Sequence, residues 1–298
     1  YEWAATANLP PLTANLLGLA LISGSIGKCA QFPLHLWLDE AMEGPNPASL
    51  LRNSLVVGCG AYVLIKLLPI LALSPLTLST LIGIGTVTAI GESLVAIAQI
   101  DIKRSLSHTT SAYLGLVFIA LGLQRADIAA ALLVAHAVAK ALLFMSIGSV
   151  ILVTNNQDLT EMGNLLARMP ATTRAFIVGA AGLIGLLPLG GYWALSKGIN
   201  AFWGEYPWIV AIFLFVNGIN AFGITRIYRL VFLGNSHSKS RRAPEVDWPM
   251  ALPMVTLTIV TLFTPLFLQK LSLLPIANSE YLIQPAQSLL VASSLIGF

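Results

Sequence analysis

Charged residues are scarce in this 298-residue chain, and their scarcity excludes an ordinary water-soluble domain. Asp, Glu, Lys and Arg together make up 10% of the sequence, whereas hydrophobic residues make up 56%. A soluble domain carries roughly 25% charged residues, so this chain lacks the polar side chains to cover a globular surface. We therefore expect lipid to be the solvent for most of the chain.

Motifs for cofactors, metals and nucleic acid are also missing. Cys29 and Cys59 stand alone, without CxxC spacing or a ligand-spaced partner, which excludes a disulfide scaffold and an iron–sulfur cluster. No GxGxxG or GxxxxGK[ST] motif occurs, so no nucleotide site is predicted. The net charge is only +3 and no basic cluster alternates with aromatic residues, so no nucleic-acid partner is expected.

Long apolar runs dominate what is present, and they predict an all-α, polytopic membrane protein. A hydrocarbon core about 30 Å thick needs roughly 20 apolar residues of helix. Such runs lie at 9–38, 49–73, 76–100, 105–123, 128–153, 171–203, 207–232 and 250–268, with a ninth expected from residue 284. Because the chain opens with Tyr1 rather than Met and ends within an apolar stretch, we expect a fragment of a longer protein.

Two of these runs are too long for one straight crossing, and each contains a proline. Pro33 lies within 9–38, and Pro188 lies within 171–203. An interior proline removes a helix hydrogen bond and clashes with the preceding turn, so both runs are expected to be broken helices. Five crossings separate them, so the second runs opposite to the first, as in inverted repeats around a transport site. Two unrelated kinks are the alternative.

The inverted repeat predicts the domain organisation. We expect one transmembrane domain over residues 1–298, in which 9–123 carries the end of one half-repeat into the next. The second half-repeat is expected at 128–232, and C-terminal helices at 243–298. Basic residues then gather in loops on one side, which the positive-inside rule places in the cytoplasm or stroma. They are Lys103, Arg104, Arg168, Arg174, Lys239, Arg241 and Arg242, against Arg125 and Lys270 on the other side.

Lys140 is the clearest candidate for a functional residue. It lies near the middle of 128–153, about 18 Å from either end. A lysine side chain reaches only about 6 Å, and exposing it at the helix centre costs on the order of 3 kcal/mol or more, so it is expected to face protein or water. His136 lies one turn earlier on the same face. The pair predicts a proton relay, and a static ion pair between Lys140 and a carboxylate is the alternative.

Three further charged residues lie inside apolar runs. Lys28 lies beside the Pro33 break, where freed carbonyl groups and water offer partners. Glu92 is deep in its span, and it is interpreted either as a proton carrier or as the partner of a lysine. Lys197 follows the second break. Lys66 is expected to reach the interface from near a helix end, and Arg226 and Arg229 are expected to anchor a span. His35 and His108 are expected to be satisfied polar residues near interfaces.

Several short motifs carry a family resemblance. Residues 27–38 read GKCAQFPLHLWL, 41–47 read AMEGPNP, 99–104 read QIDIKR and 136–144 read HAVAKALLF; Gln157-Asp158 and Met162-Gly163 follow. In this order they resemble the motifs of the antiporter-like subunits of respiratory and photosynthetic NADH dehydrogenases, most closely those of the F-type subunit. The match covers most of residues 20–235 and little from Ala243 onward.

The resemblance implies a fold of two inverted five-helix bundles with protonatable residues along the mid-membrane plane. By position, Lys28 corresponds to the first-channel lysine of the family and Lys140 to the central lysine, with His136 as its companion. Lys197 corresponds to the second-channel lysine, and Lys103 is a further candidate. The chain departs from the family pattern at Arg52-Asn53, Glu92, Leu132, Leu152 and the acidic pair missing after Lys197.

The departures resemble one branch of the family. Residues 37–40 (WLDE) and 51–54 (LRNS) are similar to the variant F subunits of the cyanobacterial NAD(P)H dehydrogenase that serve carbon dioxide uptake. The resemblance implies a proton-translocating membrane-arm subunit that removes the proton released as carbon dioxide and water become bicarbonate. In this form we expect Glu92 to act as a proton acceptor and Arg52 as a charge tuner in one polar route.

The resemblance also implies partners and a location. The partners are the lipid bilayer, other membrane-arm subunits including an adjacent D-type subunit, and an extrinsic carbon dioxide hydration subunit. Plastoquinone and iron–sulfur clusters are expected elsewhere in the oxidoreductase complex, no cofactor is expected in this chain, and the location is a cyanobacterial thylakoid membrane. A subunit of a multisubunit Na⁺/H⁺ antiporter, which shares the motifs, and a structural spacer held by buried charges are the alternatives.

Overall fold

A computed structural model describes residues 9–186, 188–235, 240, 243–274 and 285–297. The α-helices are α2 (Pro11–Lys28), α3 (Leu36–Glu40), α4 (Asn46–Leu51), α5 (Gly58–Leu71), α6 (Pro75–Ala98), α7 (Ile102–Gly122), α8 (Ala126–Thr154), α9 (Pro170–Leu183), α10 (Gly190–Phe202), α11 (Pro207–Tyr228), α12 (Trp248–Lys270) and α13 (Pro285–Ile296). Short 3₁₀ turns, η1 (Ala41–Glu43) and η3 (Leu159–Glu161), and π turns, η2 (Arg52–Val56) and η4 (Arg229–Leu233), join them. Among the described residues the only extended pairing is one bridge between Asp101 and Asp158, which confirms the all-α prediction.

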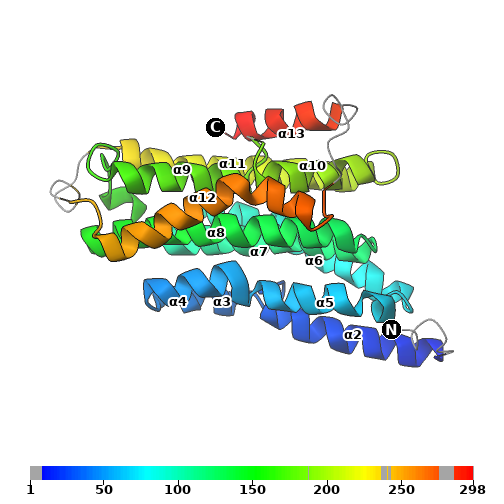
Figure 1. The fold of residues 1–298 in the computed structure, drawn as a ribbon. Helices are drawn as coiled ribbons and strands as arrows, with labels where there is room; N and C mark the ends of the chain where they lie inside the picture. The colour runs from blue at the N-terminus through cyan, green and yellow to red at the C-terminus, as the bar shows by residue number, and fades with distance from the viewer. Residues whose placement is uncertain (1–8, 187, 236–239, 241–242, 275–284, 298) are drawn as a thin grey trace.

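The helices form three layers with α7 and α8 in the middle (Figure 1). Helices α2 to α5 pack on one side of this layer and α9 to α11 on the other, while α12 lies across α8 and α9. Residues 105–122 of α7 are all buried, although the first third of that stretch is polar. A polar helix segment in the middle of the fold places hydroxyl and imidazole groups where water is scarce.

Five helical segments are long and apolar enough to cross a membrane: Asn46–Leu71, Pro75–Ala98, Ala126–Thr154, Pro207–Leu233 and Trp248–Lys270. Each coincides with a predicted run to within about three residues at either end. The predicted count of nine spans is not confirmed. The runs at 9–38 and 171–203 each divide into shorter helices, and α13 has only 12 residues.

Both predicted helix breaks are present. Helix α2 ends at Lys28 and the chain resumes as α3 at Leu36, with Pro33 between them. Helix α9 ends at Leu183 and α10 begins at Gly190, so Pro188 also lies between two helices. The inverted relation between the two halves stays a prediction.

Hydrogen bonds from neighbouring helices hold the first break. The side-chain amide of Gln31 donates to Cys29 O at 3.1 Å and to Ser111 O on α7 at 3.1 Å. The backbone N–H of Phe32 donates to Thr88 Oγ1 on α6 at 3.0 Å. Backbone groups freed by a break are costly in a membrane unless protein groups satisfy them, so these bonds explain why the break is tolerated.

The loops assigned to the basic side do lie at one end of the fold. Arg104 at the start of α7 lies 3.4 Å from Asp39 of α3 and 3.3 Å from Glu43 of η1. Asp101, just before α7, pairs with Asp158 after α8. The last basic residues of this group, Lys239, Arg241 and Arg242, fall outside the described residues.

Helices α6 and α7 approach each other closely at two glycines. A Cβ atom added to Gly85 would lie 2.6 Å from the carbonyl oxygen of Gly115, which is closer than real Cβ contacts. Small residues are the means by which membrane helices bring their backbones together. Gly83, two positions earlier on α6, has no atom within 4 Å of such a Cβ.

Gly85 and Gly83 give a matched stability prediction. Gly85→Ala is expected to destabilise the protein by about 1–3 kcal/mol through overpacking. Gly83→Ala should be neutral, or should stabilise by up to about 1 kcal/mol, because alanine favours the helix. Thermal unfolding of the purified protein in detergent measures both, and equal effects of the two substitutions would contradict the close packing of α6 on α7.

Candidate functional site

Lys140 lies in the middle of α8 and is completely buried within the chain. Its ammonium group donates a hydrogen bond to Leu106 O of α7 at 2.7 Å and another to Thr109 Oγ1. No carboxylate in the described part of the chain forms an ion pair with it. The expectation that Lys140 faces protein rather than lipid is confirmed, and the static ion pair is not found among the described residues.

His136 is buried one turn before Lys140 on α8. Its ring stacks on Tyr113 of α7, with the ring centroids 5.2 Å apart. Neither ring nitrogen has a hydrogen-bond partner among the described residues, and the same holds for the Tyr113 hydroxyl. Buried polar groups are almost always hydrogen-bonded, so an unpartnered imidazole beside a buried amine is a candidate proton-exchange group.

The second helix break lies against this segment of α8. A Cβ atom on Gly182, near the end of α9, would lie 3.4 Å from Cβ of Ala139. One on Gly190, at the start of α10, would lie 3.4 Å from Cβ of Ala135. The two sides of the break therefore flank the turn of α8 that carries His136.

Lys197 on α10 has a carboxylate partner that the sequence did not indicate. Its Nζ lies 2.8 Å from Asp127 Oδ2 at the start of α8 and donates to Leu273 O at 2.6 Å. Asp127 also contacts Arg125 at 3.2 Å. Asp127 thus supplies a negative charge next to Lys197, where the acidic pair of the family motif is missing.

Lys28 is the last residue of α2, at the edge of the first break. Its side chain is exposed in this chain and has no hydrogen bond or ion pair among the described residues. Gly60 of α5 packs beside it, since a Cβ there would lie 3.1 Å from Cβ of Lys28. Lys28 therefore lies at the first break and close to α5.

Lys103 and Arg52 both hold the loop that follows the first break. Lys103 Nζ donates to Gly44 O at 3.0 Å, and Arg52 Nη1 donates to Ala41 O at 2.9 Å. Cations of this kind satisfy the carbonyl groups that short helices leave unpaired. Arg52 has no contact with Glu92, so the structure does not bring together the two residues grouped by the sequence.

Glu92 is buried in α6 and its partners are histidines. Its Oε2 lies 2.6 Å from His108 Nδ1 of α7, and its Oε1 lies 3.5 Å from His35 Nε2 in the first break. The alternative in which Glu92 neutralises a lysine is wrong for the described residues. His35 and His108, which are expected from the sequence to be satisfied polar residues near interfaces, do have a polar partner, because helix packing brings both to the carboxylate of Glu92.

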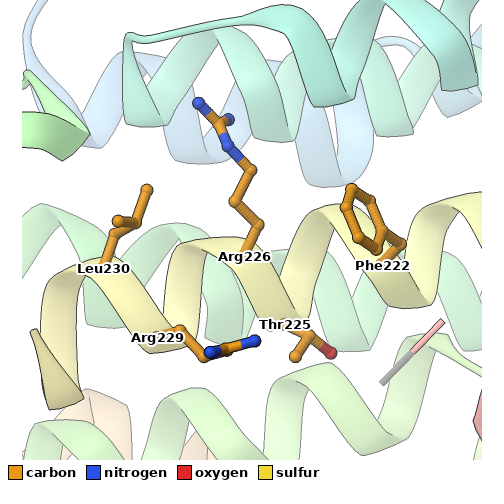
Figure 2. A pocket seen from close by; sticks show the side chains of 5 residues that line it. All are labelled: Phe222, Thr225, Arg226, Arg229 and Leu230. Carbon is orange, nitrogen blue, oxygen red and sulfur yellow. The ribbon is translucent and has the colours of Figure 1, made fainter.

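A separate pocket of about 360 Å³ opens beside the end of α11. Figure 2 shows Arg226 extending from α11 toward the neighbouring helices, while Arg229 lies on the other side of α11 with Thr225. Arg226 Nη1 donates to Gln99 O at 2.7 Å, so it ties α11 to the end of α6. None of the candidate proton carriers lines this pocket.

The family model and the similar proteins that match this chain agree on one family. Residues 4–220 match the family described as "NADH:quinone oxidoreductase/Mrp antiporter, TM". The relative named NAD(P)H-quinone oxidoreductase subunit 5, organellar chromatophore 2, from Paulinella chromatophora is 58% identical, covering 92% of this chain and 44% of the relative. The chloroplastic subunits 5 of Sorghum bicolor and Citrus sinensis are 37% and 36% identical over 78% and 75% of this chain, and over 33% and 31% of their own lengths. The chain thus spans less than half the length of these relatives. Because the family match covers well over half of it, the chain belongs to the NADH:quinone oxidoreductase/Mrp antiporter transmembrane family.

Proposed function

We propose that this chain is the proton-translocating part of a membrane-arm subunit in a photosynthetic NAD(P)H- or ferredoxin–plastoquinone oxidoreductase. The observation that carries the proposal is Lys140, a fully buried lysine with two hydrogen-bond acceptors and no carboxylate partner among the described residues. Lysines inside membrane segments are expensive and mark ion pathways. The relatives named as subunit 5 of NAD(P)H-quinone oxidoreductase support the assignment to such a complex.

Lys140 is placed to exist in both protonation states. As an ammonium it uses Leu106 O and Thr109 Oγ1 as acceptors. As a neutral amine it offers a lone pair, and the hydroxyl of Thr109 can then donate to it. His136, one turn away, has two ring nitrogens open to a proton. Lys28 at the first break and Lys197 at the second provide carriers on either side of this pair.

The finer proposal is that the complex is the carbon dioxide uptake form, in a thylakoid membrane. Hydration of carbon dioxide by water yields bicarbonate and one proton, and a subunit that removes the proton favours hydration. The segments at 37–40 and 51–54 support this proposal, as does the buried carboxylate of Glu92. Arg52, the first residue of η2, tunes the local charge from its hydrogen bond to Ala41 O. Plastoquinone and the iron–sulfur clusters belong to other subunits of the complex.

Purification of the native assembly through a tag on this chain tests the proposal. Mass spectrometry should identify quinone-reducing subunits with iron–sulfur clusters, an adjacent D-type subunit and an extrinsic subunit that hydrates carbon dioxide. Recovery of antiporter subunits alone would favour the Na⁺/H⁺ antiporter. An oxidoreductase without the hydration subunit would contradict the finer proposal and leave the coarser one in place.

A further inference from the structure

Four titratable side chains from three parts of the fold form a chain at the basic end. His35 Nε2 lies 3.5 Å from Glu92 Oε1, and Glu92 Oε2 lies 2.6 Å from His108 Nδ1. The other ring nitrogen, His108 Nε2, lies 3.2 Å from Asp39 Oδ1. The cluster, here called the His–Glu–His–Asp chain, joins α3, α6 and α7 and includes none of the lysines described above.

His108 has a suitable partner in each of two protonation states. Glu92 accepts a hydrogen bond, so Nδ1 of His108 carries a proton that it donates. The other nitrogen, Nε2, lies 3.2 Å from the amide nitrogen of Gln99 and 3.2 Å from Asp39 Oδ1. A neutral ring accepts from the Gln99 amide at Nε2, whereas an imidazolium has the charge of Asp39 beside it, whose Oδ1 has no hydrogen-bond partner among the described residues. A ring provided for in both states can gain and lose a proton without leaving a buried group unpaired.

The four side chains of the His–Glu–His–Asp chain differ in burial. The side chains of His108 and Glu92 are 8% and 7% exposed, whereas those of Asp39 and His35 are 20% and 21% exposed. The chain therefore has a dry centre and two more accessible ends. Both ends belong to one turn of α3: His35 is its N-cap, beside the first helix break, and Asp39 lies one turn later.

Negative charges outnumber positive ones around the His–Glu–His–Asp chain, which favours binding of a proton there. Arg104 is the cation that contacts it, 3.4 Å from Asp39 and 3.3 Å from Glu43. Asp39 and Glu43 therefore share one guanidinium, whereas the charged partners of Glu92 in the described part of the chain are the two histidines. Gln99 is held in place by Arg226 of α11 through its carbonyl oxygen, so α11 adds a fixed contact at this end. A proton on either histidine brings the charges of the group closer to balance.

We propose that the His–Glu–His–Asp chain carries protons between the basic-side surface and the first helix break, as a route additional to Lys140. A proton on Asp39 passes to Nε2 of His108, and the imidazolium releases its Nδ1 proton to Glu92. Rotation of the Glu92 carboxyl group presents that proton to Nε2 of His35. Each transfer breaks one O–H or N–H bond and forms another. The transfers leave the remaining His108 proton on Nε2, and exchange with water, which takes the Nε2 proton and returns one to Nδ1, restores the first tautomer.

This inference rests on the proposed proton translocation, and a static clamp between α3, α6 and α7 is the competing explanation. Three variants remove single carriers while keeping hydrogen-bonding groups of similar size: Asp39→Asn, Glu92→Gln and His108→Gln. Glu40→Gln is the matched control, because Glu40 is the next residue of α3, is exposed and lies outside the chain. All are made in the complete complex, with assembly checked by native electrophoresis.

Proton uptake into membrane vesicles that hold the intact complex is the first measurement. Each of the three variants is expected to lower its rate about tenfold or more, equivalent to about 1.4 kcal/mol per factor of ten in the barrier. Glu40→Gln should keep the wild-type rate. Infrared difference spectra between two pH values provide the second measurement, with a deuterium-sensitive carbonyl band of protonated Glu92 that is lost in Glu92→Gln and kept in Glu40→Gln.

Assembled variants that take up protons at the wild-type rate overturn the inference. If a variant fails to assemble, the infrared spectrum of the wild-type complex decides, and the absence of a band assigned to Glu92 overturns it as well. A Lys140 variant separates the two proposals. Loss of proton uptake in that variant, with normal uptake in the three chain variants, removes only this route, whereas normal uptake in all of them removes the proposed function too.

Discussion

Replacing Lys140 with methionine is expected to lower proton translocation by about a hundredfold or more, the scale that a positioned proton carrier contributes. Methionine has nearly the length of lysine, so it fills the site on α8 without leaving a large cavity. Removing a buried charge that has no carboxylate partner relieves its desolvation, so assembly and stability should be maintained or improved. Proton uptake and native electrophoresis of the same preparation give both results.

Lys66→Met is the matched control for this prediction. Lys66 on α5 is exposed and lies over the Tyr62 ring at 5.6 Å, near a helix end. The control should leave proton uptake unchanged. A spacer in which buried charges only hold helices together makes the opposite prediction for Lys140→Met, namely a complex that assembles poorly and conducts normally where it does assemble.

Asp127→Asn is expected to slow proton translocation about ten- to hundredfold. Asp127 holds the ammonium group of Lys197 at 2.8 Å, and a displacement of about 1 Å in a reacting group can cost about a hundredfold. A double-mutant cycle with Lys197→Met measures the coupling. The two substitutions should be strongly non-additive, because either one removes the same interaction.

Arg125→Gln distinguishes this pair from general packing of the loop. Arg125 contacts Asp127 at 3.2 Å, but both side chains are about two-fifths exposed, and such pairs contribute about 0–1 kcal/mol. Its effect on proton uptake should be small. An effect as large as that of Asp127→Asn would show that the loop, rather than Lys197, determines the rate.

Apolar length and proline made much of the fold predictable. The runs at 76–100, 128–153 and 207–232 became helices at Pro75–Ala98, Ala126–Thr154 and Pro207–Leu233, because crossing a hydrocarbon core requires that length. Both proline-containing runs broke, because proline cannot continue the backbone hydrogen bonds of a helix. The central position of Lys140 in its run was enough to predict its burial.

Contacts between distant helices were beyond the same reasoning. His35, Glu92 and His108 meet because α3, α6 and α7 pack at one end, and nothing in their local sequence indicates that packing. Asp127 reads as an ordinary acidic residue in the first turn of a helix until α10 places Lys197 beside it. Helix periodicity specifies which residues share a face of one helix, but not which faces of different helices meet.

Lys140→Arg tests the central claim most directly, because arginine keeps the positive charge and cannot release its proton at physiological pH. The measurement is proton uptake by vesicles that contain the assembled complex, compared with wild type and with Lys140→Met. A proton relay predicts that Lys140→Arg assembles and translocates as poorly as Lys140→Met. Uptake by Lys140→Arg at the wild-type rate would contradict the account, because a fixed charge would then be sufficient at this position.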